Sequence, residues 1–293
     1  MSAATAAPDA VPAGERPPAR HKRRRWTSFI LPVFTIGMIV YLASPVILMI
    51  VYSFNEIRGE RQIAKFTCCT LRWWQGFREI PDLNEALATS LWVAIRASFV
   101  AAILGSLIGL VLGRYPFRGR SLVNFVVFLA IAIPEIVLGS ALLSLFVQTN
   151  INRPLGITVT IGEATILFSH IAFAIPFVAI TVRARVQGMD RSLENAAQDL
   201  FATPLVAFFK VTFPLILPGI LAGFLLSFVL SLDDFVITNF VQGQVNTFPT
   251  WVYGATRIGV PPQVNVWGSI LFAGGALVAG ISLLRSSRRS SAA

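Results

Sequence analysis

The chain has 293 residues, of which 55% are hydrophobic and only 13% are charged, and its mean hydropathy is +0.71. A soluble domain of this length needs more polar surface, so this composition excludes a soluble protein and predicts a polytopic membrane protein. The net charge of +10 does not indicate a nucleic-acid partner, because Lys and Arg gather beside apolar segments, as membrane orientation requires.

The N-terminal segment, residues 1–26, is rich in Ala and Pro and ends in a basic run at residues 21–25. It shows no hydrophobic periodicity, so we expect a disordered basic tail. The apolar segment that follows, residues 27–54, is too long for the apolar region of a signal peptide. It also lacks a small-residue cleavage site at its end, so we interpret it as an uncleaved anchor.

Six apolar segments are long enough to cross a membrane as helices. Each reaches the roughly 20 residues that about 30 Å of hydrocarbon requires. We therefore predict an all-α polytopic membrane protein, with a six-span domain over residues 27–284 and a cytoplasmic tail over residues 285–293. In the second segment, Gly105 and Gly109 have the GxxxG spacing that permits close helix packing. The segments are residues 27–53, 84–113, 121–148, 163–182, 214–238 and 264–284.

The distribution of basic residues predicts the orientation of these spans. Sixteen Lys and Arg lie in one alternating set of connecting segments, and seven lie in the other set. The positive-inside rule then places both termini in the cytoplasm, together with the long segment between the fourth and fifth spans. The basic set comprises residues 1–26, 114–120, 183–213 and 285–293.

The longest outer segment, residues 55–84, contains Trp73, Trp74 and Phe77. These aromatic residues suit a belt at the membrane interface, and the alternative is a contact surface for a delivering binding protein. The adjacent Cys68 and Cys69 are too close for an ordinary disulfide, and two cysteines cannot complete a zinc site. We interpret them as loop residues, with a strained vicinal or an intermolecular bridge as the alternative.

Ionisable residues inside the spans are candidates for function, because a charge in hydrocarbon needs a partner or a cavity. Glu135 follows Pro134 near the middle of the third span, where proline can kink a helix. An acid beside a kink suits a gate or a cation-relay position. An ion pair with Arg96 on the second span would instead serve packing alone, and the sequence does not separate these two interpretations.

The fifth span carries a polar stripe. Ser227, Ser231, Asp234 and Thr238 are spaced four, three and four residues apart, which places them on one helical face. Asp233 is about 100° away from Asp234 on a helix. We therefore expect Asp234 to face the pathway and Asp233 to meet a neighbouring span or a partner subunit. The alternative is that both acids lie at the water interface without a role.

His170 has apolar neighbours on its helical face, which favours a neutral imidazole hydrogen-bonded within the bundle. The only other histidine is His21, so the sequence indicates no metal site. It also has no phosphate-binding loop of the form GxxxxGK[ST] and no nucleophile with a base and an orienting acid. The chain is therefore not predicted to be an enzyme, and any nucleotide hydrolysis belongs to another polypeptide.

The segment at residues 187–213 reads as two short helices joined by a turn at residues 202–204. Asp190, Glu194, Asp199 and Lys210 keep it out of hydrocarbon, so it must lie against water or another protein. A charged helical pair between two spans is typical of a docking element.

This segment resembles the "EAA" coupling loop of bacterial ABC-importer permeases. In register, the family's Glu-Ala-Ala triplet falls on Asn195, Ala196 and Ala197, its glycine on Phe201, and its closing Ile-x-Leu-Pro on residues 211–214. The flanking residues 53–56, 71–74, 133–139, 227–237 and 254–265 are similar to the spermidine/putrescine subfamily. The resemblance covers roughly residues 30–284.

The resemblance implies a type I importer permease that works with a second permease, two ATP-binding subunits and an extracytoplasmic binding protein. It implies that the helix at residues 192–200 inserts into an ATPase cleft. ATP and Mg²⁺ would then be bound by the ATPase, and no cofactor by this chain. The expected coupling residues are Glu194 and Asp199 on the polar side of that helix, with Leu193, Ala196, Ala197 and Leu200 in apolar contact.

Phe201 departs from the family pattern, because glycine permits a turn with positive φ that Phe adopts only at a cost. Two interpretations are open. Either the turn is shifted to residues 202–204, or the Phe201 side chain makes an apolar contact with the ATPase.

For polyamine substrates, which are flexible polycations, the pathway should present carboxylates and aromatic faces. The expected pathway residues are Asp234, Asp233, Glu135, Ser231 and Trp251, with Trp92 and Tyr253 as further aromatic candidates. An ABC permease for another small solute is one alternative. Another is an ion-coupled carrier of small cations that uses Glu135 and Asp234 as its coupling groups. A membrane enzyme or scaffold is disfavoured by the missing catalytic residues.

Overall fold

The computed structural model describes residues 27–56, 66–67, 69–152 and 159–290, which are almost entirely helical and contain one isolated bridge, between Asn55 and Cys69. The chain divides into two compact units, residues 1–48 and 49–293. The helices are α1 (Thr27–Tyr52), α2 (Arg72–Gln75), α3 (Pro81–Arg114), α4 (Arg120–Ala132), α5 (Glu135–Asn152), α6 (Glu163–Gln187), α7 (Ser192–Asp199), α8 (Pro204–Ala207), α9 (Phe213–Asp233), α10 (Val236–Val241), α11 (Phe248–Ala255) and α12 (Pro262–Ser290).

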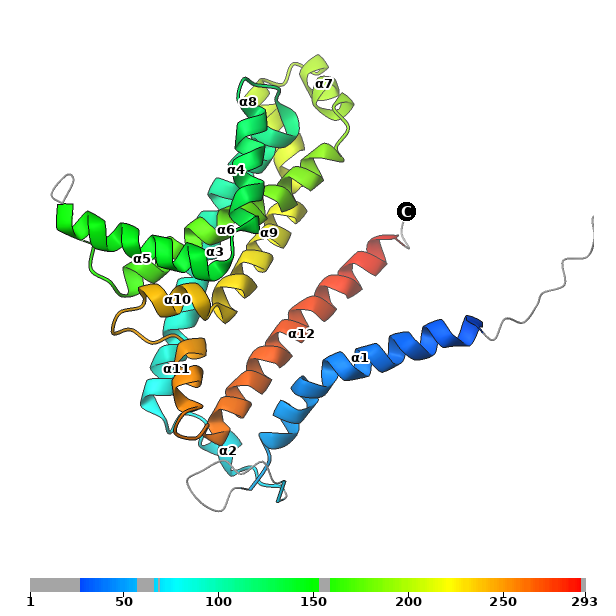
Figure 1. Cartoon of the computed structure of the whole chain (residues 1–293). Coiled ribbons are helices and arrows are strands. Elements are labelled where there is room, and N and C mark those ends of the chain that lie inside the picture. Colours follow the sequence, from blue (N-terminus) through cyan, green and yellow to red (C-terminus); the bar gives the residue numbers. More distant parts are fainter. Residues whose placement is uncertain (1–26, 57–65, 68, 153–158, 291–293) are drawn as a thin grey trace, which may run out of the picture. The chain divides into compact units, whose positions relative to one another are not determined.

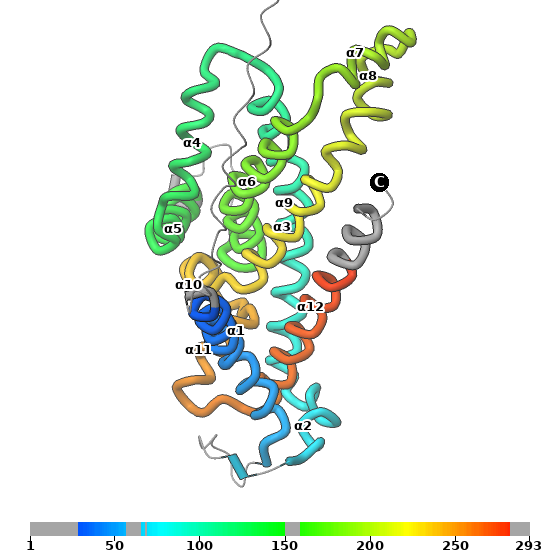
Figure 2. The backbone as a smooth tube through the Cα atoms, turned by 90° about the vertical axis from the view of Figure 1, so that its right-hand side faces the viewer, coloured from blue at the N-terminus to red at the C-terminus, as the bar shows by residue number. Residues whose placement is uncertain are grey.

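The core of the second unit is formed by α3, α6 and α9, which lie side by side in both views (Figures 1 and 2). Glycine permits the close approach of α3 and α6. A Cβ atom on Gly105 would lie 2.6 Å from Cβ of Val178, and one on Gly109 would lie 2.6 Å from the backbone oxygen of Ala179. The close packing predicted from the GxxxG spacing is therefore confirmed.

The contact between α6 and α9 also depends on glycine. A Cβ atom on Gly223 would lie 3.0 Å from Cγ1 of Val178, and one on Gly219 would lie 2.8 Å from Cβ of Arg185. Because no side chain separates the two backbones at these points, α6 and α9 are held at short range along the half nearer α7. Small and branched residues fill the space around them: Ala101, Ala174, Val178, Val182, Val186 and Ile216.

The third predicted span is not one straight helix. It consists of α4 and α5, which are bent by 106° at the break between Ala132 and Glu135. Pro134 lacks a backbone N–H and disfavours helical backbone at Ile133, which is extended with φ −67° and ψ 127°. The predicted kink is confirmed, but a single continuous helix is wrong.

Five helices in the described ranges are long and apolar enough to cross a membrane, and the bent pair of α4 and α5 makes a sixth candidate. The predicted all-helical polytopic architecture is therefore confirmed. In α1, apolar side chains are exposed on all sides, as is typical of a membrane span.

Two boundaries differ from those expected. The fifth span, predicted to end at residue 238, ends as a helix at Asp233, and a separate helix, α10, begins at Val236. The last helix, α12, continues to Ser290 and so covers most of the predicted tail at residues 285–293. The predicted disordered tail at residues 1–26 lies outside the described residues.

The segment between α6 and α9 contains the two short helices predicted for it, α7 and α8, joined by a turn at residues 200–203. Thr203 accepts a hydrogen bond from the backbone N–H of Val206, and Pro204 occupies the first helical position of α8. A π-helical stretch, Phe208–Thr212, then leads into α9.

Candidate functional site

The coupling loop is anchored to the rest of the unit by Glu194 of α7. Its carboxylate forms an ion pair with Arg114, the last residue of α3, and accepts a hydrogen bond from the Thr212 hydroxyl. Arg191 Nη2 donates to the backbone oxygen of Arg114 at 2.9 Å. We call Arg114, Arg191, Glu194 and Thr212 the loop anchor. Glu194, expected on the polar side of the coupling helix, thus faces α3 and the residue before α9.

The electrostatics of the loop favour ionised acids. Partial burial alone would raise the pKa of Glu194, but the hydrogen bonds from Thr212 and Arg114, together with the charges of Arg114 and Arg191, hold it below its ordinary value. Hydrogen bonds from Ser192 likewise lower the pKa of Asp190, which precedes α7. Both carboxylates are therefore charged at neutral pH.

The outer surface of the coupling loop is apolar at its turn. Leu200, Phe201 and Leu205 are 82%, 97% and 72% exposed, and we call these three residues the coupling patch. Phe201 has a φ of 64°, in the left-handed region that glycine favours. The turn is therefore not shifted away from Phe201, and its side chain is available for contact. Ala196 and Asp199 are exposed and Ala197 is half-buried.

A second polar cluster lies at the break between α9 and α10. His170 on α6 is 1% exposed. Its Nδ1 lies 2.7 Å from Ser231 Oγ, and its Nε2 lies 2.9 Å from Thr238 Oγ1 and 3.2 Å from Asp234 Oδ2. We call His170, Ser231, Asp234 and Thr238 the helix-break cluster. The prediction of a histidine hydrogen-bonded within the bundle is confirmed.

Asp234 satisfies the backbone at the start of α10. Its Oδ2 accepts from the Thr238 N–H and from Thr238 Oγ1, each at 2.8 Å, and its Oδ1 accepts from the Ile237 N–H at 3.3 Å. Free N–H groups at a helix start are stabilised by a nearby carboxylate. Asp234 thus holds α10 in place after the chain has left α9.

The two adjacent acids differ from expectation. The side chain of Asp234 is only 2% accessible, whereas Asp233 is exposed. The expected single helical face does not exist, because α9 ends at Asp233 and Asp234 is extended with ψ 120°. Thr238 bonds Asp234 directly, whereas Ser231 is connected to it through His170. The Ser227 hydroxyl bonds to the Phe224 oxygen of its own helix.

Glu135, at the start of α5, is exposed. Arg96 does not pair with Glu135, because it forms an ion pair with Glu163 at the start of α6. The packing interpretation of Glu135 as the partner of Arg96 is therefore wrong. One turn after Glu135, α5 packs closely on α10, the helix that follows Asp233 and Asp234, since a Cβ atom on Gly139 would lie 2.8 Å from the Phe240 ring.

Aromatic residues also surround the break. Phe235, between α9 and α10, packs against Tyr253 of α11 with their ring centroids 4.6 Å apart. Trp251, the aromatic residue expected in the pathway, is half-buried on the same helix, and Trp92 is 61% exposed on α3. Sequence reasoning did not single out Phe235, although it directly follows the two acids.

In the outer segment, the indole groups bond within the chain. Trp73 Nε1 donates to the backbone oxygen of Asn55 at 2.8 Å, and Trp74 Nε1 donates to Ser53 Oγ at 3.2 Å. Phe77 packs against Trp267 with centroids 4.9 Å apart. These contacts join α2 to the residues that follow α1, and join the segment after α2 to α12. Cys68 lies outside the described residues, so its interpretation stays a prediction.

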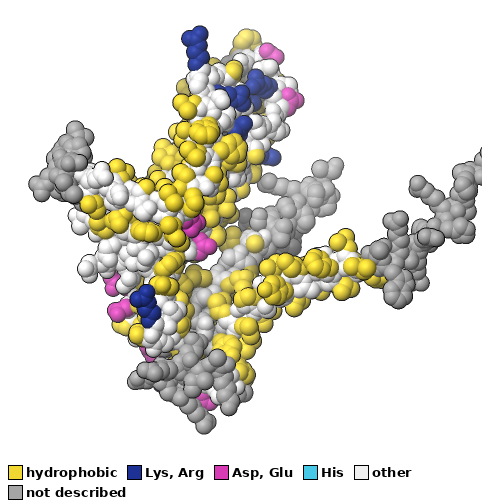
Figure 3. All heavy atoms as spheres, in the orientation of Figure 1, with side chains coloured by type: hydrophobic (Ala, Val, Ile, Leu, Met, Phe, Trp, Pro, Cys, Tyr) yellow, Lys and Arg dark blue, Asp and Glu magenta, His cyan; other side chains and the backbone are white. Residues whose placement is uncertain are grey.

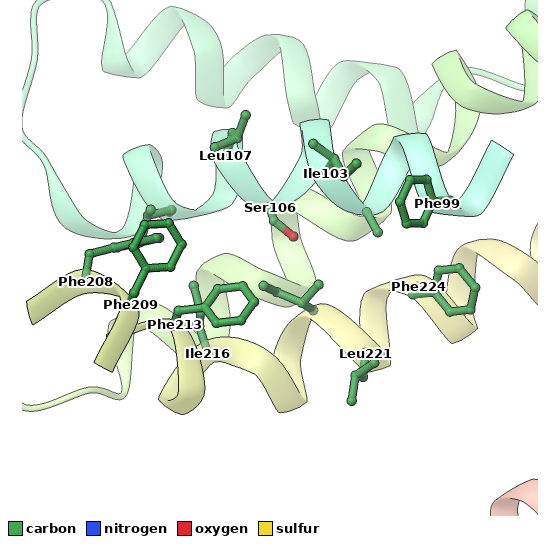
Figure 4. Close-up of a pocket in the computed structure, with 13 residues that line it drawn as sticks. Phe99, Ile103, Ser106, Leu107, Phe208, Phe209, Phe213, Ile216, Leu221 and Phe224 are labelled. Carbon is green, nitrogen blue, oxygen red and sulfur yellow. The ribbon is translucent and has the colours of Figure 1, made fainter. Parts of the chain in front are cut away.

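A cavity of about 510 Å³ lies between α3 and α9 (Figure 4). Its wall is almost wholly apolar, with Phe99, Phe213 and Phe224 among the aromatic residues and Ser106 the sole polar side chain of its lining. No carboxylate lines it, so this cavity does not suit a polycation. Among the residues that the structure describes, no group of three His, Cys, Asp or Glu side chains could hold a metal ion.

Comparison with known proteins agrees with this arrangement. The family model described as "Binding-protein-dependent transport system inner membrane component" matches residues 105–288, more than half of the chain. The chain belongs to this family. It is therefore a multi-pass inner-membrane component of a transport system that depends on a binding protein, and the permease family expected from the sequence is confirmed.

Two relatives of this inner membrane component come from Escherichia coli K12. The putrescine transport system permease protein PotI is 34% identical over 79% of this chain and 81% of its own length. The spermidine/putrescine transport system permease protein PotC is 36% identical over 81% of this chain and 86% of its own length.

Solved structures of ABC transporters share the fold. A chain of a bacterial transporter that imports the acidic polysaccharide alginate has a TM-score of 0.62 at 15% identity, covering 92% of this chain and 99% of that one. A chain of the MetNI methionine transporter has a TM-score of 0.51 at 21% identity, covering 71% and 98%. The expected importer-permease fold of the inner membrane component is confirmed.

Proposed function

We propose that this chain is the permease subunit of an ATP-driven importer that moves polyamines delivered by an extracytoplasmic binding protein. The observation that carries the proposal is the similarity over most of the chain to PotI and PotC, whose names state putrescine and spermidine transport. The acids at the helix break support it chemically, because a polyamine is a flexible polycation that needs carboxylates.

The proposed pathway passes the exposed acids Glu135 and Asp233. A cation that lies between two carboxylates lowers their repulsion, so these two acids favour the entry of a cation. The aromatic residues Phe235, Tyr253 and Trp251 lie on the neighbouring elements and can contribute cation–π contacts. In this proposal the buried Asp234 and Ser231 do not contact the substrate, and they hold the residues around the helix break in position.

The proposed assembly contains a second permease, two ATP-binding subunits and the binding protein, in a lipid bilayer. ATP and Mg²⁺ belong to the ATP-binding subunits, and this chain binds no cofactor. Lys and Arg side chains gather at the end of the unit that carries α7 and α8 (Figure 3). This distribution supports a cytoplasmic position for the coupling loop. We place both termini on the same side, because the basic connecting segments of the sequence include them.

In this proposal, the coupling helix α7 and the coupling patch dock into a cleft of the ATPase. The half-buried Ala197 leaves no room for a long side chain at that contact. We expect Ala197→Arg to lower both transport and co-purification of the ATPase, with Lys210→Arg, which keeps the charge, as the matched control. Unchanged transport and co-purification for Ala197→Arg would contradict the docking site.

The proposed substrate is tested by uptake of labelled spermidine into vesicles that contain the whole complex. We expect uptake that requires ATP and the binding protein and that is unaffected when ion gradients are collapsed. Uptake driven by an ion gradient without the ATPase would support an ion-coupled carrier instead. Uptake of another small solute in place of polyamines would agree with an ABC permease and would contradict the proposed polyamine substrate.

Within that assay, Asp233→Asn removes one pathway charge from an exposed position. We expect the KM for spermidine to rise about tenfold, since losing one close charge pair costs on the order of 1 kcal/mol or more. Asp82→Asn, in the first turn of α3, is the matched control at a distant exposed acid. A wild-type KM in a fully assembled Asp233→Asn complex would remove Asp233 from the pathway.

A further inference from the structure

The hydrogen bonds of the helix-break cluster have one arrangement in which a neutral imidazole leaves no partner unsatisfied. Thr238 Oγ1 donates to Asp234 Oδ2, so its oxygen is free to accept from a protonated Nε2 of His170. Nδ1 of His170 then accepts from the Ser231 hydroxyl. The imidazole thus joins the last turn of α9 to the first turn of α10, across the point where the backbone is broken.

The backbone between α9 and α10 does not by itself fix the position of α10. Asp234 is extended between α9 and α10, and α10 has only six residues. A helix this short is not stable alone, so its position depends on contacts with its neighbours. His170 supplies such a contact from α6, and every side chain of the cluster is buried. The position of α10 is therefore set by its packing on α5 and by the polar links from α6, which are made by His170 and by Thr165, whose hydroxyl donates to the Val241 oxygen.

The α6 helix also leads directly to the coupling loop. From His170 to the end of α6 at Gln187 there are 17 residues, or about 26 Å of helix at 1.5 Å per residue. Between these points, Gly219 and Gly223 keep α9 packed tightly on α6. The helix α6 thus leads into the coupling loop at its C-terminal end and contributes His170 to the helix-break cluster nearer its N-terminal end.

We propose that His170 is a positioning residue that makes the helix break move together with α6. A displacement of the coupling loop then reaches Asp233, which directly precedes the break, and Glu135, which lies near it on α5. The inference rests on the proposed function, and it assigns to His170 the link between ATP hydrolysis and the exposure of these acids. Without the imidazole, Thr165 remains the polar link from α6 to α10, and the acids follow a movement of α6 less closely.

The test compares His170→Leu, His170→Gln and Ser169→Ala in the reconstituted complex. Leu removes all three imidazole contacts, whereas Gln retains a donor and an acceptor. Ser169 is the matched control, because it is the adjacent residue of α6, is fully buried, and its hydroxyl has no hydrogen-bond partner. The two rates measured are ATP hydrolysis and spermidine uptake. The decisive quantity is the number of ATP molecules hydrolysed for each spermidine taken up.

We expect His170→Leu to keep ATP hydrolysis within about twofold of wild type and to lower uptake at least tenfold, so that much more ATP is spent per spermidine. In His170→Gln the ratio of ATP hydrolysis to uptake should return most of the way to the wild-type value. In Ser169→Ala the ratio should equal that of wild type. If the Leu variant does not assemble, Thr238→Val is expected to raise the same ratio, because it removes both hydrogen bonds of the Thr238 hydroxyl, to His170 and to Asp234, at nearly constant volume.

An unchanged ratio in the assembled variants, or equal losses of hydrolysis and uptake, would overturn the inference, because a merely structural role lowers both rates together. Failure of the wild-type complex to take up spermidine with ATP would instead contradict the proposed function.

Discussion

The loop anchor ties α7 to α3 and to the residue before α9, and the helix-break cluster ties α10 to α6 and α9. The two clusters do so by different means. The loop anchor uses full charges, and its Glu194 side chain is 22% exposed. The helix-break cluster uses directed hydrogen bonds around His170, and the side chains of His170 and Asp234 are each 2% exposed. Water and salt therefore reach the first and do not reach the second.

This difference in exposure decides how much each cluster stabilises. Ion pairs that are open to solvent contribute little, because water screens them. Buried polar groups are costly whenever a partner is removed, because nothing replaces the lost hydrogen bond. The helix break should accordingly tolerate substitution poorly, and the coupling loop should remain adjustable.

The largest effect is expected for Asp234→Ala. This substitution leaves the N–H groups of Ile237 and Thr238 and the Thr238 hydroxyl without their acceptor. We expect a loss of about 3 kcal/mol in the free energy of unfolding, measured by denaturation in detergent. Asp233→Ala, at the exposed neighbour, should cost less than about 0.5 kcal/mol. Equal losses for the two variants would contradict the burial difference.

A smaller effect is expected for Glu194→Gln, which leaves the buried Arg114 without a charged partner. We expect a loss of about 1 kcal/mol, reduced from that of a buried pair by solvent screening, and faster amide exchange in α7. Asp199→Asn, on the same helix but exposed, is the control and should leave exchange unchanged. Slow exchange in α7 of Glu194→Gln would show that the loop is held by other contacts.

The loop anchor should also respond to acidification, through the titration of Glu194. The folded-state pKa of Glu194 lies below its ordinary value of 4.5. Its contribution to stability is therefore fully present above about pH 4.5 and is lost as the pH falls through the lower, folded-state value. We expect the contact of α7 with α3 to weaken in that pH range, and a fluorophore attached to the loop would report the change. Glu194→Gln should abolish this pH dependence, and a persistent dependence would assign it to another acid.

The smallest expected effect concerns Phe201→Gly. Glycine relieves the left-handed backbone of Phe201 but gains entropy in the unfolded chain, so the net stability should change by less than about 1 kcal/mol. If the coupling patch docks on the ATPase, co-purification of the ATPase should nevertheless fall. Phe201→Leu, which keeps an apolar side chain, is the control. Normal co-purification of the Gly variant would exclude the ring from the interface.

Features that depend on local sequence were predictable. The apolar segments, the kink at Pro134, the turn between α7 and α8, and the close packing at Gly105 and Gly109 all have local physical causes. The resemblance of the loop and its flanks to importer permeases also located the family. These signals identify the fold because each acts within one helix or one turn.

Features that depend on tertiary contacts were not predictable. The break at Asp234 has no Pro or Gly to announce it, and the spacing of Ser231, Asp234 and Thr238 fits one continuous helix equally well. The partner that decides the matter, His170, is more than 60 residues away. Likewise, Arg96 pairs with Glu163 rather than Glu135, because the 106° bend between α4 and α5 redirects the chain.

The coupling patch has a practical consequence for handling the protein. Leu200, Phe201 and Leu205 expose apolar side chains on a loop whose charged residues keep it in water. Exposed clusters of this kind promote self-association. A preparation of this subunit alone should therefore aggregate through the loop even when detergent covers its membrane helices. Co-expression with the protein that covers the patch should yield the monodisperse material.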